Sequence, residues 1–176
     1  WFDNRVTNPV SNVTQSVTSS QTTRMRNNLG STRIWGVQTD AKLRVGSFWT
    51  FSGGYLYDQG KVTEYAADPA LVGRFIPQVP QHRGTLQAVW DNPRFVTASV
   101  QLQFVDSQFD DDQNLLPLAG YTLTDVQVTR RIHRNLGVFF GIQNAFNTEV
   151  VVGKNPTTIG APRLFNAGLR LRLSGA

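Results

Sequence analysis

The chain has 176 residues, enough for one domain with a sizeable core, and it contains no cysteine. Without cysteine, a disulfide-stapled domain and a thiolate metal site are excluded. The apolar fraction of 40% and the mean hydropathy of −0.26 exclude a helical membrane protein, because a spanning helix needs about 20 consecutive apolar residues. The net charge of +5 is carried mostly by arginines scattered along the chain, so we expect no nucleic-acid partner.

The first third of the chain predicts a strand, a polar loop and a long hairpin. Residues 1–10 have a short strand-like pattern that begins directly at Trp1 without a signal peptide, so we expect a segment of a longer protein. Residues 11–28 are dominated by Ser, Thr, Gln and Asn, which is typical of a loop, and their β-propensity would let them extend the flanking strands. Residues 35–43 and 49–57 alternate between apolar and polar, as in the two arms of a hairpin.

Aromatic residues mark both ends of the second arm of this hairpin. Trp49 lies at the turn, and Tyr55 and Tyr57 lie further along. A membrane β-barrel carries aromatic girdles at its two interfaces, whereas a soluble β-sandwich alternates without that placement. The pattern therefore favours a wall that spans a membrane.

The rest of the chain continues as strands separated alternately by long loops and short turns. Further alternating runs predict strands at residues 85–90, 95–105, 121–131, 136–152 and 163–173. Long extracellular loops are predicted near residues 11–28, 59–81, 106–118 and 153–162. Outer-membrane barrels show this asymmetry, with short periplasmic turns and longer extracellular loops. We therefore predict an all-β fold, an antiparallel transmembrane β-barrel to which this chain contributes about eight strands.

The last predicted strand has two clearly different faces. Phe165 and Leu169 lie on one face, and Arg170 and Arg172 lie on the other. In a barrel wall the first face meets lipid and the second meets the lumen. The same reasoning places further charged side chains on or near the lumen face: Arg33, Asp40, Lys42, Arg44 and Asp125.

Four short motifs follow one another at strand-sized spacing. They are residues 28–30 (NLG) with 34–38 (IWGVQ), residues 53–58 (GGYLYD) with 79–82 (VPQH), residues 120–122 (GYT) and Asp125 with 141–147 (GIQNAFN), and residues 160–165 (GAPRLF). In this order they resemble the C-terminal barrel region of TonB-dependent outer-membrane receptors.

The resemblance implies a barrel of about 22 strands around a plugged lumen. Residues 1–176 would be the C-terminal part of that barrel, with the plug domain upstream and absent from this chain. The implied function is energy-coupled uptake of a siderophore, vitamin, sugar or peptide across the bacterial outer membrane into the periplasm, with no enzymatic activity and no cofactor. The implied partners are the lipid bilayer with its lipopolysaccharide, the rest of the barrel, the plug, and TonB acting through the plug region.

Two other interpretations stay open. A self-contained eight-stranded outer-membrane barrel could have a structural or adhesive role, although inward glycines such as Gly54 and Gly141 leave few large side chains to fill a closed interior. The second interpretation is a soluble β-sandwich enzyme, but the sequence contains no catalytic motif that would support it. His82 and His133 are the only histidines, and both are expected to be polar residues at strand ends or turns.

Candidate binding residues lie in the predicted loops and on the lumen face. Tyr65, Arg74 and Phe75 would either contact a ligand at the outer mouth or pack their loop on itself. Asp125, Arg170 and Arg172 would either contact the plug or solvate the lumen.

Three consecutive acidic residues in another loop are weak candidates for a metal site. Asp110, Asp111 and Asp112 could hold a hard cation, which prefers several carboxylate oxygens. The alternative is a solvated acidic loop that attracts the divalent ions bridging lipopolysaccharide.

Overall fold

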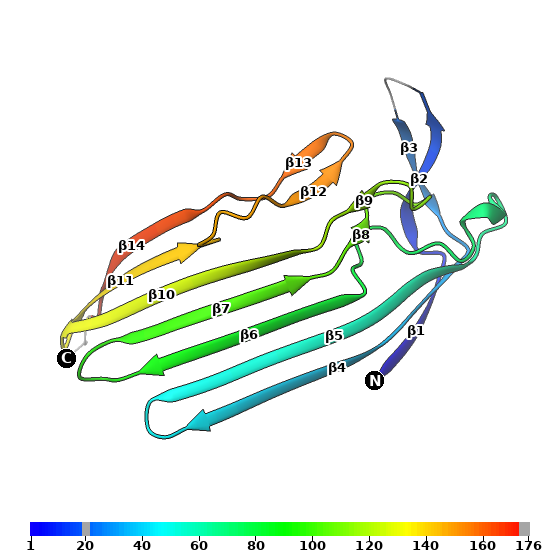
Figure 1. Ribbon diagram of the computed structural model, residues 1–176. Helices are drawn as coiled ribbons and strands as arrows, with labels where there is room; N and C mark the ends of the chain where they lie inside the picture. Colours follow the sequence, from blue (N-terminus) through cyan, green and yellow to red (C-terminus); the bar gives the residue numbers. More distant parts are fainter. Residues whose placement is uncertain (19–21, 173–176) are drawn as a thin grey trace.

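The structure, a computed structural model, describes residues 1–18 and 22–172. Its main body is one antiparallel sheet of eight strands in the order β1-β4-β5-β6-β7-β10-β11-β14 (Figure 1). Their bounds are β1 (Phe2–Thr7), β4 (Ser31–Val45), β5 (Trp49–Glu64), β6 (His82–Asp91), β7 (Thr97–Val105), β10 (Tyr121–His133), β11 (Leu136–Gln143) and β14 (Leu164–Leu171). Each predicted strand has a counterpart in this sheet, which confirms the all-β antiparallel prediction. Leu173, expected at the end of the last strand, lies outside the described residues.

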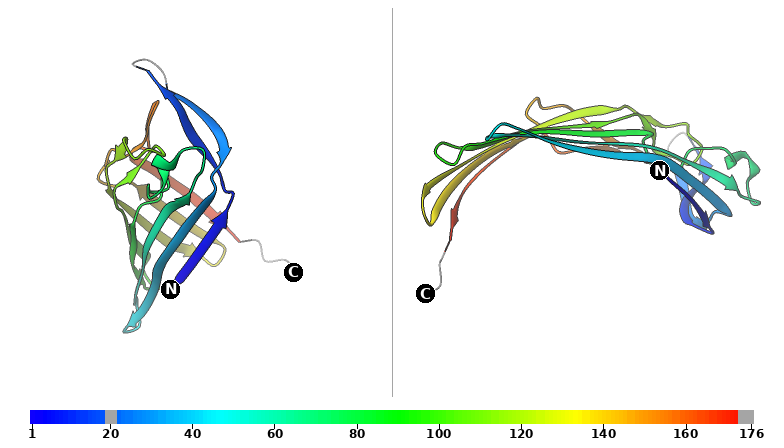
Figure 2. Two further views of the ribbon diagram at one scale, coloured as in Figure 1. Left: turned by 90° about the vertical axis from the view of Figure 1, so that its right-hand side faces the viewer. Right: turned by 90° about the horizontal axis from the view of Figure 1, so that it is seen from below.

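The sheet is an open, curved wall. Figure 2 shows it as an arch when seen from below. In the described part of the chain, β1 pairs with β4 and β14 pairs with β11, and the first and last strands do not pair with each other. The pairing that a self-contained eight-stranded barrel requires is therefore not present in these residues. Nor does this part contain a helix with the length and apolar character to cross a membrane.

The register of the strands separates an apolar face from a polar face. One row of directly opposed residues crosses seven strands: Leu43, Phe51, Ala88, Val100, Val126, Ile142 and Phe165. The adjacent row lies on the other face: Lys42, Ser52, Gln87, Gln101 and Asp125. Four residues of the apolar row are exposed, namely Leu43, Phe51, Val100 and Phe165, the last at 64%. A contiguous apolar surface of this extent indicates contact with lipid or protein.

Short strands gather at the loop end of the sheet, opposite the end with the tight turns (Figure 1). They form three small two-stranded sheets, made by β2 (Val10–Val17) with β3 (Thr22–Asn28), β8 (Gln108–Phe109) with β9 (Pro117–Leu118), and β12 (Val151–Lys154) with β13 (Thr157–Ile159). A single 3-10 turn, η1 (Pro69–Leu71), lies between β5 and β6. The loop expected at residues 11–28 is thus a hairpin of its own, because its threonines and valines favour extended backbone.

The two largest shifts of predicted boundaries are at the ends of β5 and β11. The loop expected to begin at residue 59 begins after Glu64, since β5 continues to pair with β4 that far. The strand expected over residues 136–152 ends at Gln143. Asn144 has a φ of 49°, and its side-chain oxygen accepts a hydrogen bond from the Thr148 amide at 2.8 Å. This asparagine turn interrupts the strand although apolar residues continue beyond it.

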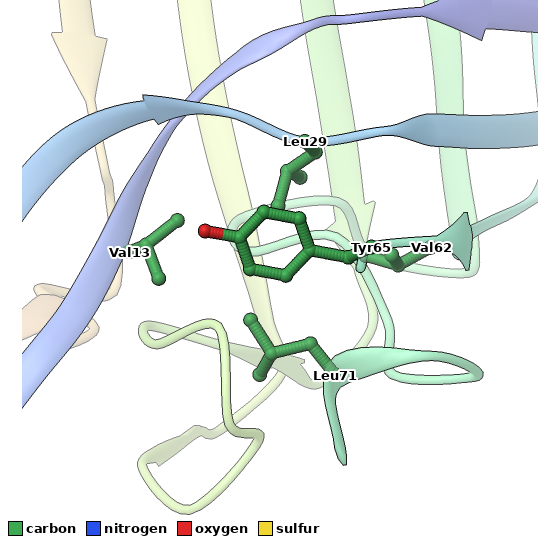
Figure 3. Packing of buried hydrophobic residues seen from close by; sticks show 5 residues of the cluster. All are labelled: Val13, Leu29, Val62, Tyr65 and Leu71. Atoms are coloured by element: carbon green, nitrogen blue, oxygen red, sulfur yellow. The ribbon is translucent and has the colours of Figure 1, made fainter. Parts of the chain in front are cut away.

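A small hydrophobic core lies at the loop end. Figure 3 shows how Tyr65 packs among four aliphatic side chains contributed by β2, the link between β3 and β4, β5 and η1: Val13, Leu29, Val62 and Leu71. All five residues are at most 7% exposed. This cluster fixes the hairpin and the 65–81 loop against the end of the sheet.

Candidate functional site at the loop end of the sheet

Three buried carboxylates lie between β8 and β9. Asp110, Asp111 and Asp112 are exposed by only 7%, 6% and 7%. Burial of an ionised carboxylate is costly unless hydrogen bonds compensate it. These three residues, here called the carboxylate hub, obtain the required donors from four different loops.

Asp112 holds the β2–β3 hairpin. One of its oxygens accepts from the Thr14 amide at 3.0 Å, and the other accepts from the Thr14 hydroxyl at 2.6 Å. These bonds join positions 98 residues apart in the sequence. Hydrogen bonds to a charged acceptor are the stronger kind, so the contact anchors the hairpin.

Asp110 joins three further segments. Its oxygens accept from the Gln78 side-chain amide at 3.0 Å and from the Lys154 backbone amide at 3.1 Å. The Arg24 guanidinium lies 3.8 Å away. Asp110 therefore connects β3, the 65–81 loop and the β12–β13 hairpin.

Asp111 closes its own loop. Both of its oxygens accept from the Leu115 amide, and one also accepts from the Leu116 amide at 2.7 Å. The turn formed in this way presents Asn114, which accepts from the Phe75 amide and donates to the Phe75 carbonyl. The hub thus ties its own loop to the 65–81 loop as well.

The hub differs from both interpretations of the acidic segment. The carboxylates are buried, so the loop is not a solvated one. All six carboxylate oxygens already accept a hydrogen bond from the protein. In the described residues no group of three or more His, Cys, Asp or Glu is placed to hold a metal ion. The geometry favours a structural role in holding the loops together.

A polar cleft of about 540 Å³ opens beside the hub. Besides the hub, its lining includes Asn12, Arg24, Arg26 and Gln78. Arg24 is half-buried and Arg26 is exposed. The cleft therefore offers cations and amide groups next to fixed negative charge, which suits a polar ligand carrying both donors and acceptors.

The three ligand candidates of the 65–81 loop do not converge on one point. Tyr65 is buried in the hydrophobic core, and its hydroxyl accepts from the Asn27 side chain at 2.9 Å. The Phe75 ring lies under the Lys61 ammonium, 4.7 Å from it. Arg74 is exposed and remains available to a ligand. Their role in ligand binding stays a prediction.

The polar-face candidates lie at two levels of the sheet. Asp125 accepts a hydrogen bond from the Asn144 amide at 2.9 Å, so it stabilises the turn after β11. Arg170 and Arg172 lie at the turn end and line a cleft of about 270 Å³. Three more arginines line the same cleft: Arg130, Arg131 and Arg134. Plug contact by these residues stays a prediction.

Aromatic clusters border the apolar face at both ends. At the loop end Trp35 packs edge-on against Tyr57 at 5.5 Å, and the Tyr55 hydroxyl lies 2.6 Å from Nδ1 of His82. At the turn end Trp49 lies opposite Trp90. Such pairs fit the two interfacial girdles expected from the sequence.

One lumen-face prediction is wrong. Asp40, Lys42 and Arg44 lie on the polar face, but Arg33 shares the apolar face with Trp35 and is paired with Asp3. The cause is a reversal of polarity beyond the girdle. At this level the loops cover the face that is polar elsewhere in the sheet, and this face carries Ile34. The opposite face, which is apolar elsewhere, carries charged side chains here.

Comparisons with known proteins agree with this fold. Residues 1–145 match the family model described as TonB dependent receptor-like, beta-barrel. The comparison with curated proteins gives no match.

Among solved structures, the siderophore receptor PiuA from Acinetobacter baumannii is 15% identical with a TM-score of 0.75, and the match covers 96% of this chain and 25% of PiuA. The copper transporter OprC is 16% identical with a TM-score of 0.76, covering 96% and 27%. The ferric citrate transporter FecA is 23% identical with a TM-score of 0.71, covering 92% and 27%. The chain thus spans about a quarter of the length of these proteins.

The family match covers most of the chain and most of the main sheet, from β1 to β11. The chain belongs to the family of TonB-dependent receptor β-barrels.

Proposed function

We propose that this chain forms part of the wall and the extracellular mouth of a receptor for energy-coupled uptake across the bacterial outer membrane. The observation that carries the proposal is the carboxylate hub, which holds four loops around a polar cleft at one end of a membrane-type sheet. Family membership supports the transport role, and the work of the chain is mechanical rather than catalytic.

The cleft beside the hub is the proposed place of ligand contact in this segment. Arg26 and Arg24 supply positive charge there, and Gln78 supplies an amide. The related structures are described as a siderophore receptor, a copper transporter and a ferric citrate transporter. We therefore propose a metal complex with anionic or polar groups as the ligand, with exposed Arg74 as a further contact.

The turn end of the polar face is the proposed contact with the plug. Arg170 and Arg172 are exposed there, and none of the ion pairs seen among residues 1–18 and 22–172 involves them. An acidic segment of the plug would complement them. TonB would then pull on the plug and let the ligand pass into the periplasm.

Uptake by the full-length receptor in cells tests the proposal. Radiolabelled ferric citrate, a ferric catecholate, a ferric hydroxamate, copper and cobalamin serve as probes in a strain that lacks its own receptors. We expect at least one probe to accumulate, and its accumulation to stop when TonB is deleted or the proton gradient is collapsed. Accumulation that is independent of TonB would contradict the proposal.

A substitution in the cleft tests where the ligand binds. We expect Arg26→Ala to weaken binding of the transported probe at least tenfold, since a charge-assisted hydrogen bond to the ligand is lost. Arg94→Ala, in the exposed turn at the opposite end of the sheet, is the matched control and should bind as the wild type does. Affinity is measured on purified receptor. If the wild type, Arg26→Ala and Arg94→Ala bind the probe equally well, the cleft is not part of the binding site.

A further inference from the structure

Three cations form a row across the loop end of the sheet, on the apolar face. Arg5 of β1 lies opposite Arg33 of β4, and Arg33 lies opposite Lys61 of β5. Directly opposed side chains share one face of a sheet, with Cβ atoms about 5 Å apart. Arg5 and Arg33 are exposed and Lys61 is half-buried. We call Arg5, Arg33 and Lys61 the cationic row.

The row is electrostatically unfavourable within the chain itself. Like charges placed directly opposite each other destabilise a sheet. The one ion pair that the structure shows for the row in its described residues joins Arg33 to Asp3, with the Arg33 Nε 2.8 Å from the carboxylate. Three cations and one carboxylate leave a net charge of +2, which an anion from outside the chain would offset.

The height of the row matches the headgroups of a bilayer. Lys61 lies four residues beyond Tyr57 on β5, about 13 Å along the strand at about 3.3 Å per residue. With a strand tilt of about 40°, this is about 10 Å along the membrane normal. Tyr57 belongs to the girdle at the edge of the hydrocarbon, and the polar headgroup layer begins there. Long Lys and Arg side chains can reach across the remaining few ångströms.

We propose that the cationic row binds the phosphate groups of a lipid in the outer leaflet of the outer membrane. The row faces away from the cleft beside the hub, because the loops cover the opposite face at this level. The cationic row borders the apolar face, so the acyl chains of the same lipid would lie against the apolar side chains of that face. The Phe75 ring, 4.7 Å from the Lys61 ammonium, holds that cation in place. This inference rests on the membrane location proposed above, but not on the identity of any transported ligand.

Lipid binding by the purified full-length receptor tests the inference without any transport step. Lipid A with both phosphates is titrated in detergent, and bound lipid is counted by native mass spectrometry. We expect the double variant R5Q/K61Q to bind roughly 30-fold more weakly, about fivefold for each cation near an anionic surface. The control K42Q/R44Q removes the same charge from the polar face of the β4–β5 hairpin, and it should bind as the wild type does.

A second variant should change the affinity for lipid A in the opposite direction. D3N removes the carboxylate that competes with phosphate for Arg33, so binding should tighten several-fold. Such a gain cannot result from misfolding.

The inference is overturned if R5Q/K61Q binds as tightly as the wild type, if K42Q/R44Q loses as much affinity, or if lipid A without phosphates binds equally well. An acidic peptide that binds more tightly than lipid A would replace the lipid with a protein partner and would also overturn it. Uptake assays on the same variants report separately on the transport proposal.

Discussion

At the scale of single residues, the buried carboxylate of Asp112 anchors the β2–β3 hairpin through hydrogen bonds. It is 7% exposed, and both of its oxygens are satisfied by Thr14. Few other contacts hold this side of the β2–β3 hairpin, since β2 and β3 pair only with each other. Besides these two hydrogen bonds, the hairpin is held by the Arg24–Asp110 ion pair, by the hydrogen bond from Asn27 to Tyr65 and by the small core around Val13.

Removal of this carboxylate should loosen the hairpin. We expect Asp112→Ala to weaken the anchorage of the hairpin by about 1–3 kcal/mol, because a charge-assisted pair of hydrogen bonds is lost and the Thr14 amide is left unpaired. Hydrogen exchange of the full-length receptor should show faster exchange of the amides of β2, with the main sheet unchanged. Asp112→Asn keeps one acceptor oxygen and should lie between the two. Unaltered exchange in Asp112→Ala would show that the remaining contacts hold the hairpin without Asp112.

At the scale of elements, the pairing of β11 with β14 depends on glycines that leave room for neighbouring side chains. Phe139 lies opposite Gly168 in the register. A Cβ built on Gly168 would come within 2.7 Å of two ring carbons of Phe139. The ring thus covers the glycine and fills the space on the polar face, in the manner of aromatic rescue of a glycine in a sheet.

A methyl group at this position should therefore strain the strand pair. We expect Gly168→Ala to lower the stability of the folded receptor by about 1–3 kcal/mol, because the Phe139 ring must leave its place. The second substitution Phe139→Leu should restore part of the loss. Thermal unfolding in detergent measures both effects, and a pair of independent, additive losses would contradict the steric explanation.

At the scale of the whole molecule, the sheet is a wall with two open edges. In the described residues the outer sides of β1 and β14 have no strand partner. An unpaired row of backbone groups cannot face hydrocarbon, because each unsatisfied group there costs several kcal/mol. Both edges must therefore continue into further strands in the membrane.

Protection of these edges is measurable. In the full-length receptor we expect slow hydrogen exchange at all amides of β14, residues 164–171, including those directed away from β11. The same chain expressed alone in detergent should exchange every second amide of that strand rapidly and should tend to aggregate. Complete protection in the isolated chain would indicate that it closes on itself.

The main sheet was predictable from the sequence because its alternation has a fixed period. Leu43 and Phe51 fall on one face wherever the turn between them is short, so the lipid face follows from sequence position alone. The assignment failed at Arg33, where the strand leaves the lipid and the loops cover its inner face, so that polarity reverses while the period continues. The hub was not predictable, since Asp112 and its partner Thr14 are 98 residues apart and no local pattern links them.

The hub also limits how the loop end of the sheet can change over evolutionary time. Because each carboxylate oxygen already has a donor from a particular loop, a change in the length of one loop near the hub disturbs the other loops as well. Positions away from the hub, such as Val72 and Ile159, are exposed and have no such constraint. New ligand specificity would therefore arise most readily by substitution at the loop tips, while the bases of the loops stay fixed around three aspartates.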